Sequence, residues 1–528
     1  MIVAVTATAA ATAGAVSAVR TQLPPLRLPS VEYSAILPEL ILMGAALALL
    51  LGSSLTRRRP GPGLFTAVTV AAALASMGAA WKLWADVVPA HGGQAAAAAH
   101  HPYTAMSGAL AVDGFSVFFM VLLTSALVLS ALLGDAWLRR EGIQGPEYHV
   151  LALFCVSGAM LMAAANDLLV LFLALEILSI PLYVLAGFDS RRRQSREAAM
   201  KYFVLGAFSS ALLLYGIALV YGGTGSTSLP QIATYLAQQV ITSNGVLLAG
   251  LALLMAGLGF KVAAVPFHAW TPDVYQGAPS PVTGFMAAAA KAGGFAGLLR
   301  VFFSTFAILR LDWQPLVWVL AVLTLLVGSV LAVVQTDIKR MLAYSSISHA
   351  GFVLIGLQAG TVKGIAGALF YLLAYTFMVL GSFGIVTLVG RRGDTHHSLD
   401  DYRGLAGRRP GLALAFAVFL MAQTGVPFTT GFLAKFYVIS AAVASRSYAL
   451  AVIGMLSAVI AAFFYLKVIV LMYSPATGED EAPRAALPRI PLPATVAVTL
   501  VVALAVTVVF GLVPAPMITF ARKATLLF

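Results

Sequence analysis

The sequence predicts an all-α integral membrane protein with about fourteen transmembrane helices. Of its 528 residues, 60% are hydrophobic and only 10% are charged, and the mean hydropathy is +0.94. A soluble domain is about 45–50% apolar and about 25% charged. Apolar runs of about 20 residues, the length that spans a bilayer as a helix, recur along the whole chain. These runs are too long and too continuous for the strands of a membrane β-barrel.

The apolar runs divide the chain into predicted spans. The runs are 35–55, 64–81, 115–133, 150–165, 168–188, 200–221, 245–270, 282–303, 316–334, 341–357, 365–389, 412–442, 450–473 and 494–513. Residues 1–33 are rich in Ala and Thr and lack the positive charge that precedes the apolar core of a signal peptide, which favours an extracytoplasmic extension. Residues 34–148 then hold the first three helices, and residues 474–528 hold a loop and the last helix.

The formal charge of +12 predicts an orientation, and we do not expect nucleic acid as a partner. Most Lys and Arg residues lie in short loops, where they orient membrane helices. If the spans alternate, the basic clusters share one side, which the positive-inside rule makes cytoplasmic; they are 57–59, 139–140, 191–196, 339–340, 391–392, 403 and 408–409. The other side carries scattered charges such as Lys82, Arg310, Lys363 and Arg446. An even number of spans then places both termini outside the cytoplasm.

Two of the runs contain a helix break. Pro266 interrupts the seventh run, and Gly425 with Pro427 interrupts the twelfth. Proline removes a hydrogen-bond donor and clashes one turn back, so each run is predicted to form two half-helices. The breaks share the tripeptide Val-Pro-Phe and lie five spans apart, so they cross the membrane in opposite directions. Paired broken helices in opposed halves indicate an inverted repeat with an ion path at its centre.

Ionisable side chains inside the apolar runs are the candidate functional residues. Glu176, Lys261, Lys291, Lys435 and Lys467 all lie within such runs. A charge at the bilayer centre costs about 2.5–3.5 kcal/mol on insertion scales, and such residues usually face one another or water along an ion path. Burial disfavours the charged form of a lysine and a nearby carboxylate favours it, so a movable carboxylate can load or unload a lysine. A row of such lysines could pass protons through water.

Other residues leave two interpretations open. Lys201 and Lys467 lie near helix ends, where they could belong to the path or extend to the membrane surface. His349 follows a serine-rich segment and could relay a proton near neutral pH or be a buried histidine bonded to hydroxyls. His268 and Asp273, beside the first break, could shape a cytoplasmic entrance or cap the half-helix.

The sequence shows no motif for chemistry on a substrate. It has no Walker-type phosphate loop, no GxGxxG after a strand, no His/Cys metal cluster and no haem motif. Its single Cys155 excludes an internal disulfide and a cysteine cluster. We therefore expect no metal and no cofactor in this chain.

The segment around the first break carries a family resemblance. Residues 259–273 read GFKVAAVPFHAWTPD and continue as VYQGAPSPV. The first part resembles the broken seventh helix of the antiporter-like membrane subunits of respiratory complex I, and the continuation resembles the subunit N family of NADH–quinone oxidoreductase. The resemblance covers about residues 113–473.

The resemblance implies two inverted five-helix units, at 149–303 and 315–473. It also implies that Glu176 pairs with Lys261 in one half-channel, that Lys291 is the central link and that Lys435 ends the path. Lys201 matches a family lysine of less certain role, and Lys467 has no assigned counterpart.

We therefore expect a proton-translocating membrane subunit of NADH:quinone oxidoreductase in the bacterial plasma membrane. Flavin, iron–sulfur clusters and the quinone chamber would lie on other chains, and the partners would be a second antiporter-like subunit, smaller membrane subunits and lipid. The alternatives are a subunit of a multi-subunit sodium/proton antiporter or membrane-bound hydrogenase, and a structural spacer without its own path.

Overall fold

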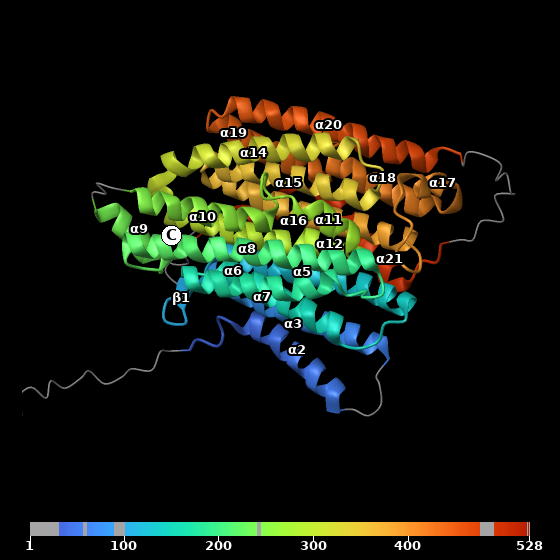
Figure 1. The fold of residues 1–528 in the computed structure, drawn as a ribbon, viewed down its shortest axis with the longest axis horizontal. Helices are drawn as coiled ribbons and strands as arrows, with labels where there is room; N and C mark the ends of the chain where they lie inside the picture. Colours follow the sequence, from blue (N-terminus) through green and yellow to red (C-terminus); the bar gives the residue numbers. More distant parts are fainter. Residues whose placement is uncertain are drawn as a thin grey trace, which may run out of the picture.

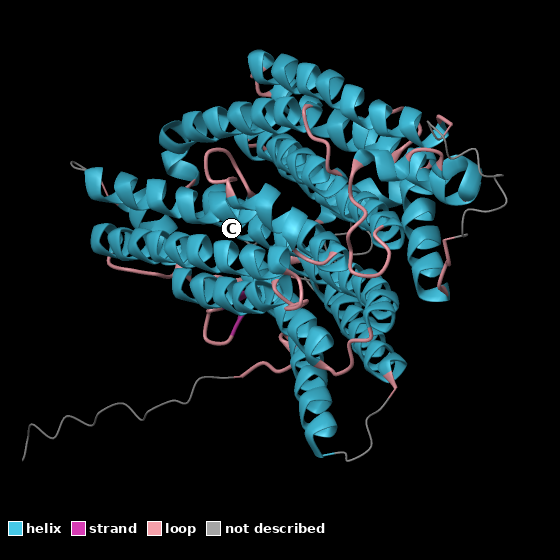
Figure 2. Cartoon of the chain, turned by 45° about the vertical axis from the view of Figure 1, so that its right-hand side comes forward, coloured by secondary structure: helices cyan, strands magenta, loops and turns pink. Residues whose placement is uncertain are grey.

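The computed structural model describes residues 31–55, 61–88, 101–239, 244–475, 490–524 and 526. The predicted extension at 1–33 lies outside the described residues up to residue 30, and so does the basic cluster at 57–59. The chain is almost entirely helical (Figure 2), and within the described residues its only strands form one short antiparallel hairpin. The predicted all-α fold is confirmed.

The first part of the chain contributes three long helices and the hairpin. They are α2 (Leu37–Leu55), α3 (Pro62–Val87), β1 (Tyr103–Ala105), β2 (Leu110–Val112) and α5 (Gly114–Glu141). The start of α5 is fixed by a capping box, in which Asp113 accepts from the backbone N–H of Ser116 and the Ser116 hydroxyl accepts from the N–H of Asp113. In Figure 1, α2 and α3 lie at one edge of a stack of roughly parallel helices, and α20 lies at the opposite edge.

Residues 147–309 form the next group of helices. They are α6 (Glu147–Ala164), α7 (Leu168–Ala186), α8 (Arg193–Thr224), α9 (Leu229–Gln238), α10 (Gly245–Val262), α11 (Trp270–Gly277), α12 (Ser280–Phe285), the π-helix η1 (Met286–Ala290), α13 (Lys291–Leu299), the π-helix η2 (Arg300–Thr305) and the 3₁₀ turn η3 (Ala307–Leu309). The segment from α12 to η2 is one continuous span that is almost wholly buried.

The remaining helices complete the stack. They are α14 (Arg310–Val333), α15 (Ile338–Ala359), α16 (Val362–Val389), the 3₁₀ turn η4 (Leu399–Tyr402), α17 (Leu405–Arg408), α18 (Pro410–Thr424), α19 (Thr430–Ala444), α20 (Tyr448–Tyr473), α21 (Ala494–Leu512) and α22 (Ala515–Lys523). The helix α21 returns to pack on α16, α5 and α19. Both α15 and α16 are almost wholly buried, whereas most residues of α8, α14 and α20 are partly or fully exposed.

Thirteen helices of the described residues are long and apolar enough to cross a membrane. The shorter apolar helices α18 and α19 together occupy the twelfth predicted run, which brings the spans to the predicted number of about fourteen. The division into two inverted units at 149–303 and 315–473 stays a prediction.

Both helix interruptions lie beside the predicted residues. The first separates α10 from α11 and begins at Ala263, which has a left-handed backbone with φ 61°. The second separates α18 from α19 and begins at Gly425, where φ is 97° and glycine is favoured. The backbone of Phe428 in this second break packs directly on Gly511 of α21, where a Cβ atom would lie 2.4 Å from the Phe428 carbonyl oxygen.

Basic loops meet at one end of the stack, which we call the arginine-rich end. There Arg140 donates to the Thr387 carbonyl, the N–H of Gly393 donates to Glu141, and Arg192 pairs with Asp394. The label α17 marks this end in Figure 1, and β1 and α9 mark the opposite end. The shared side that the loop charges predict is therefore formed by direct contacts between loops far apart in sequence.

Candidate functional site

Lys261 lies in the last turn of α10, directly before the first break. Its side chain is buried, and Nζ donates to Ser179 Oγ at 2.8 Å and to Tyr202 Oη at 3.4 Å. The Tyr202 ring stacks on Trp270 of the second half-helix with ring centroids 4.5 Å apart, so the break positions this partner. A small cavity of about 10 Å³ borders Lys261 and is lined by Ser179, Ser209 and other residues. A cavity of this size holds about one water.

Glu176 lies on α7, one turn before Ser179, but it does not pair with Lys261. No ion pair joins the two side chains among the described residues, and the ammonium bonds to Ser179 Oγ. Lys261 is still within electrostatic reach of Glu176. Glu176 is only partly buried, and its Oε1 is a buried atom without a hydrogen-bond partner. The direct pairing that the family resemblance implied is therefore not formed in this arrangement.

Lys291 lies at the centre of the buried α12–η2 span, immediately after the π-helix η1. Single π turns inside α-helices often mark functional sites. The Lys291 ammonium donates to the backbone carbonyl and the hydroxyl of Ser346 on α15, and it lies 5.7 Å from the centre of the Tyr375 ring. All of these partners are electrically neutral.

Lys435 lies on α19, just after the second break. Nζ donates to the carbonyl oxygens of Gln423 at 2.9 Å and Thr424 at 2.7 Å, and lies 4.9 Å from the centre of the Phe352 ring. These two carbonyls end α18 and have no partner within that helix, and the C-terminal end of a helix carries partial negative charge. The break therefore supplies a neutral site that favours an ammonium group.

His349 lies on α15 between these two lysines, within electrostatic reach of both. Its Nδ1 lies 2.6 Å from Tyr371 Oη, and its Nε2 lies 3.1 Å from Tyr465 Oη. The Tyr465 hydroxyl also contacts Ser345 and donates to Gln423 Oε1 at 3.2 Å. A chain of polar contacts thus extends from α15, whose Ser346 binds Lys291, to Gln423, whose carbonyl oxygen binds Lys435.

Sequence reasoning missed most of these neutral partners. The missed residues are Ser179, Tyr202, Ser346, Tyr371, Gln423 and Tyr465. Ser345, Ser346 and Ser348 lie within four residues of His349 and were a signal for a polar helix face, because residues three and four apart lie on the same side of a helix. Tyr465 is a single tyrosine in an apolar run, and nothing local distinguishes it from a packing residue.

Lys201 and Asp273 meet at the arginine-rich end. Lys201 Nζ lies 2.8 Å from Asp273 and 2.8 Å from Glu197, and Arg340 lies 2.7 Å from Asp273. Partial burial acts to raise the pKa of Asp273, but the bonds from Lys201 and Arg340 outweigh it and the pKa is lowered. Lys201, Glu197 and Asp273 border a cavity of about 420 Å³. His268 is half-buried and is not among the residues that line this cavity.

Lys467 is exposed on the outer face of α20 and does not join the other lysines. Its neighbours Leu466 and Val470 are exposed as well, whereas Tyr465 points into the core. The residue therefore occupies apolar surface that would face lipid or a partner chain.

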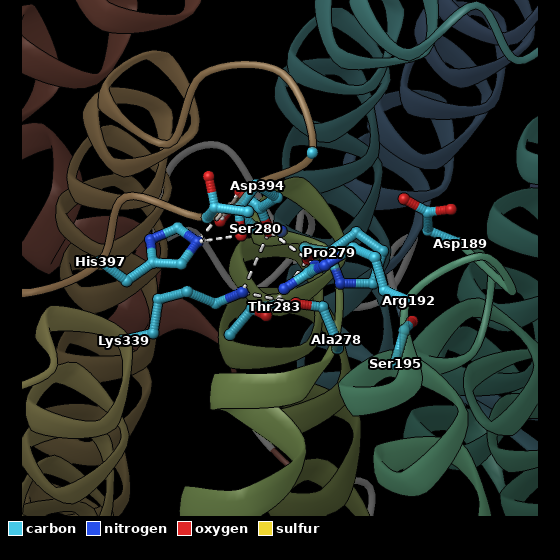
Figure 3. A network of polar contacts seen from close by, with 12 residues as sticks. Asp189, Arg192, Ser195, Ala278, Pro279, Ser280, Thr283, Lys339, Asp394 and His397 are labelled. Carbon is cyan, nitrogen blue, oxygen red and sulfur yellow. Dashed lines mark hydrogen bonds and ion pairs between the residues drawn. The ribbon is translucent and has the colours of Figure 1, made fainter.

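A second polar cluster lies at the arginine-rich end around Asp394 (Figure 3), and we call it the Asp394 cluster. One Asp394 oxygen accepts from Lys339 Nζ, Arg192 Nη1 and the Ser280 N–H at 3.1–3.2 Å, and the other accepts from the Ser280 hydroxyl at 2.8 Å. His397 Nε2 lies 3.2 Å from the carboxylate. Burial acts to raise the pKa of Asp394, but Lys339, His397 and Arg192 together hold it well below its usual value.

The Asp394 cluster joins segments from distant parts of the chain. Arg192 precedes α8, Ser280 begins α12 and Lys339 lies in the first turn of α15. Lys339 also donates to the carbonyl of Ala278, which follows α11. Sequence reasoning treated Arg192 and Lys339 only as orienting charges, because the partner Asp394 is more than fifty residues from either.

No group of three or more His, Cys, Asp and Glu side chains in the described part of the chain could hold a metal ion. The acid–base groups that lie inside the apolar spans are Glu176, which is partly buried, and Lys261, Lys291 and Lys435, which are buried, with His349 close to the last two. We call Lys261, Lys291 and Lys435 the lysine row.

The fold and the lysine row define a class of proteins. The family model described as NADH:quinone oxidoreductase/Mrp antiporter, transmembrane, matches residues 165–461. This range contains all three lysines of the row and both helix breaks. The chain thus belongs to the antiporter-like membrane proteins.

The curated relatives identify the family within that class. The chain is 46% identical over 421 residues to NADH-quinone oxidoreductase subunit N of Trichlorobacter lovleyi, which covers 80% of this chain and 85% of the relative. The chain belongs to the subunit N family of NADH-quinone oxidoreductase, as its sequence resemblance predicts.

Solved structures agree with this assignment. A chain of respiratory complex I from Thermus thermophilus is 30% identical, with a TM-score of 0.74 and coverage of 91% of this chain and 98% of that chain. A chain of the Mrp complex from Dietzia matches with a TM-score of 0.77, covering 93% of this chain and 96% of that chain, but at 20% identity that likeness concerns the fold alone.

Proposed function

We propose that the chain translocates protons across a membrane as a subunit of an NADH:quinone oxidoreductase, through Glu176, Lys261, Lys291 and Lys435. The observation that carries the proposal is the setting of the lysine row. Each of the three ammonium groups is buried and is hydrogen-bonded to neutral oxygens, and no carboxylate of the described residues is in ion-pair contact with any of them. A buried ammonium without a counter-charge can give up its proton at lower cost than a paired one.

The half of the path near Lys261 takes up and delivers protons at hydroxyl groups. Ser179 and Tyr202 hold the ammonium, and the adjoining cavity has room for about one water that can carry a proton. Glu176 acts from a distance, because a carboxylate can act electrostatically on a nearby ammonium group without a direct bond. A change in the Glu176 charge or position therefore changes how firmly Lys261 holds its proton.

The path has an entrance at the arginine-rich end in this proposal. At the arginine-rich end, the cavity bordered by Lys201 and Asp273 admits water to the level of the first half-helix pair. The positive-inside rule makes this end cytoplasmic, which places both termini outside. His268 and Lys467 are assigned no role in the path.

The chain acts as a non-redox subunit of the complex. Flavin, iron–sulfur clusters and the quinone site are assigned to partner chains, and the membrane is the bacterial plasma membrane. The partners are the other membrane subunits of the complex, including a second antiporter-like subunit, and the apolar faces of α8, α14 and α20 face lipid or these neighbours.

Alanine substitution tests the proposal in the purified complex reconstituted in liposomes. Electron transfer from NADH to quinone and proton uptake are measured together for Glu176→Ala, Lys261→Ala, Lys291→Ala and Lys435→Ala. Each variant is expected to assemble and to lose coupled proton uptake, while Lys467→Ala on the exposed face serves as the control and pumps normally. Normal proton uptake by the row variants would overturn the assignment and would favour a structural spacer.

The alternative is a subunit of a sodium/proton antiporter. The family description and the fold likeness to the Mrp complex favour it, but that structural relative shares only 20% identity. Co-purification separates the two: flavin and iron–sulfur partners support the oxidoreductase, whereas a cofactor-free complex with sodium-dependent proton movement supports the antiporter.

A further inference from the structure

The side chain of Gln423 occupies the junction between His349 and Lys435. Its backbone carbonyl accepts from Lys435 Nζ at 2.9 Å, and its side-chain Oε1 accepts from Tyr465 Oη at 3.2 Å. Gln423 is almost wholly buried. It is the second-to-last residue of α18, which ends at Thr424. One residue therefore touches both the terminal lysine of the row and the polar cluster of His349.

The surrounding hydrogen bonds fix the direction of this amide. Gln423 Nε2 donates to Ser382 Oγ at 2.7 Å, and the Ser382 hydroxyl donates to the Met378 carbonyl at 3.0 Å. The amide oxygen therefore faces Tyr465, and because an amide oxygen only accepts, Tyr465 gives it the single proton of its hydroxyl.

This direction also assigns the tautomer of His349. With its proton given to Gln423, the Tyr465 oxygen can only accept, so Ser345 donates to it and the contact of 3.1 Å with His349 is made by a proton on Nε2. Nδ1 then carries the lone pair and accepts from the Tyr371 hydroxyl at 2.6 Å. The neutral imidazole thus has its basic nitrogen on the Tyr371 side and its donor on the Tyr465 side.

The chemistry of a proton transfer stops at the amide. If His349 takes a proton on Nδ1, it can release the one on Nε2 to Tyr465 Oη only if Tyr465 releases its own proton. Tyr465 Oη has two neighbours that can accept, the Ser345 hydroxyl and Gln423 Oε1. The Ser345 hydroxyl has no further hydrogen-bond partner among the described residues, so only Gln423 leads toward Lys435, and its amide oxygen does not hold a proton under ordinary conditions. No proton can therefore continue from His349 to Lys435 while Gln423 occupies this position.

We propose that Gln423 is a positioning residue that, through Tyr465, keeps the donor proton of His349 on Nε2 and closes the path between His349 and Lys435. The inference rests on the proposed proton path and adds the point where that path is interrupted. Transfer to Lys435 then requires that the amide turn away and that a water take its place between Tyr465 and the lysine. Closure of this kind prevents passive backflow when no electrons are transferred.

Three variants in the reconstituted complex test the inference. Gln423→Glu keeps the shape but adds a group that can take a proton, and we expect a rise in passive proton conductance measured after a pH step without NADH. Gln423→Leu removes the amide oxygen that accepts from Tyr465 and puts an apolar side chain in its place. That side chain neither carries a proton nor favours water, so we expect a loss of pumping without a rise in passive conductance. Tyr465→Phe removes only the hydroxyl, and it is expected to shift the pH dependence of pumping because the His349 tautomer is no longer fixed.

The control is Gln358→Glu. Gln358 is also a buried glutamine, but it lies on α15, nine residues beyond His349 or about 13 Å along that helix. It is expected to leave the passive conductance unchanged. The inference is wrong if Gln423→Glu assembles without added conductance, or if Tyr465→Phe and Gln423→Leu both pump with an unchanged pH profile. Normal pumping by Lys291→Ala would instead defeat the proposed function itself, so the two failures are distinguishable.

Discussion

The chain buries lysines in two different settings. At the arginine-rich end, Lys339 is fully buried and pairs with Asp394, whose carboxylate also binds Arg192. In the lysine row, Lys291 and Lys435 are equally inaccessible but bond only to carbonyls and hydroxyls. A lysine next to a carboxylate is a fixed charge that holds loops together, whereas a lysine among neutral oxygens can exchange its proton. We propose that the hydrogen-bond partner, and not the burial, separates the lysine that only stabilises the fold from the lysines that transfer protons.

The largest expected effect concerns the fixed charges. Asp394→Ala leaves Lys339 and Arg192 without their shared counter-charge, and the loss of one partner from a buried ion pair costs about 3–5 kcal/mol. We expect a loss of this size in the free energy of unfolding, measured by denaturant titration in detergent. The control Asp400→Ala removes an exposed partner of Arg403 and should cost less than about 1 kcal/mol. Equal losses in the two variants would contradict the distinction.

The next prediction gives Lys291, a lysine of the row, a carboxylate partner like the one that Lys339 has. Ser346→Asp places a carboxylate on the residue that binds Lys291. An opposite charge this close favours the ammonium, and because one pKa unit is a factor of ten, proton pumping should fall by about tenfold or more. The complex should remain assembled. The matched variant Ser346→Asn has a similar shape without charge and should keep most pumping, so equal pumping by both variants would show that a counter-charge does not decide the behaviour of Lys291.

The pH dependence of stability follows from Asp394. Its pKa is held well below the usual value, so its stabilising contribution is present above the unfolded pKa of about 3.9 and is lost as the pH falls through the lower folded value. The difference in unfolding free energy between the parent chain and Asp394→Asn should therefore be constant from about pH 7 to pH 5 and shrink only at more acidic pH. A difference that decreases already between pH 7 and pH 5 would be at odds with this view.

The smallest expected effect on stability concerns Glu176. Because its Oε1 has no hydrogen-bond partner and it forms no ion pair among the described residues, Glu176→Gln should change the free energy of unfolding by less than about 0.5 kcal/mol. Proton pumping should nevertheless decrease, because Lys261 loses the charge that acts on it from a distance. A large loss of stability would place Glu176 with the fixed charges of the Asp394 cluster instead.

Much of the fold could be predicted because local sequence patterns determine it. Runs of about 20 apolar residues give the spans, and Pro266 and Gly425 mark the breaks. The row lysines could be found as well, because an ionisable residue in an apolar run is conspicuous. The sequence predicts only an orienting charge for Lys339, because it belongs to a basic cluster between two apolar runs, and its burial beside Asp394 is visible only in the structure.

The partners of the row could not be predicted, since they come from distant helices. Ser346, Gln423 and Tyr202 are ordinary polar residues in apolar surroundings until the fold brings a lysine to each. Glu176 shows the opposite case: the family resemblance implied a direct pair with Lys261, but the hydroxyl of Ser179, one turn along α7, takes that position.

A pair of lysine-to-arginine substitutions tests the central claim most directly. Arginine keeps its charge in proteins under all ordinary conditions, so it can replace a fixed cation but cannot release a proton. In the reconstituted complex, the number of protons translocated per NADH oxidised should remain near the parent value for Lys339→Arg. It should fall sharply for Lys291→Arg, although the complex still assembles and oxidises NADH. An unchanged ratio for Lys291→Arg would contradict the account, because a permanent positive charge at the centre of the row would then be compatible with pumping.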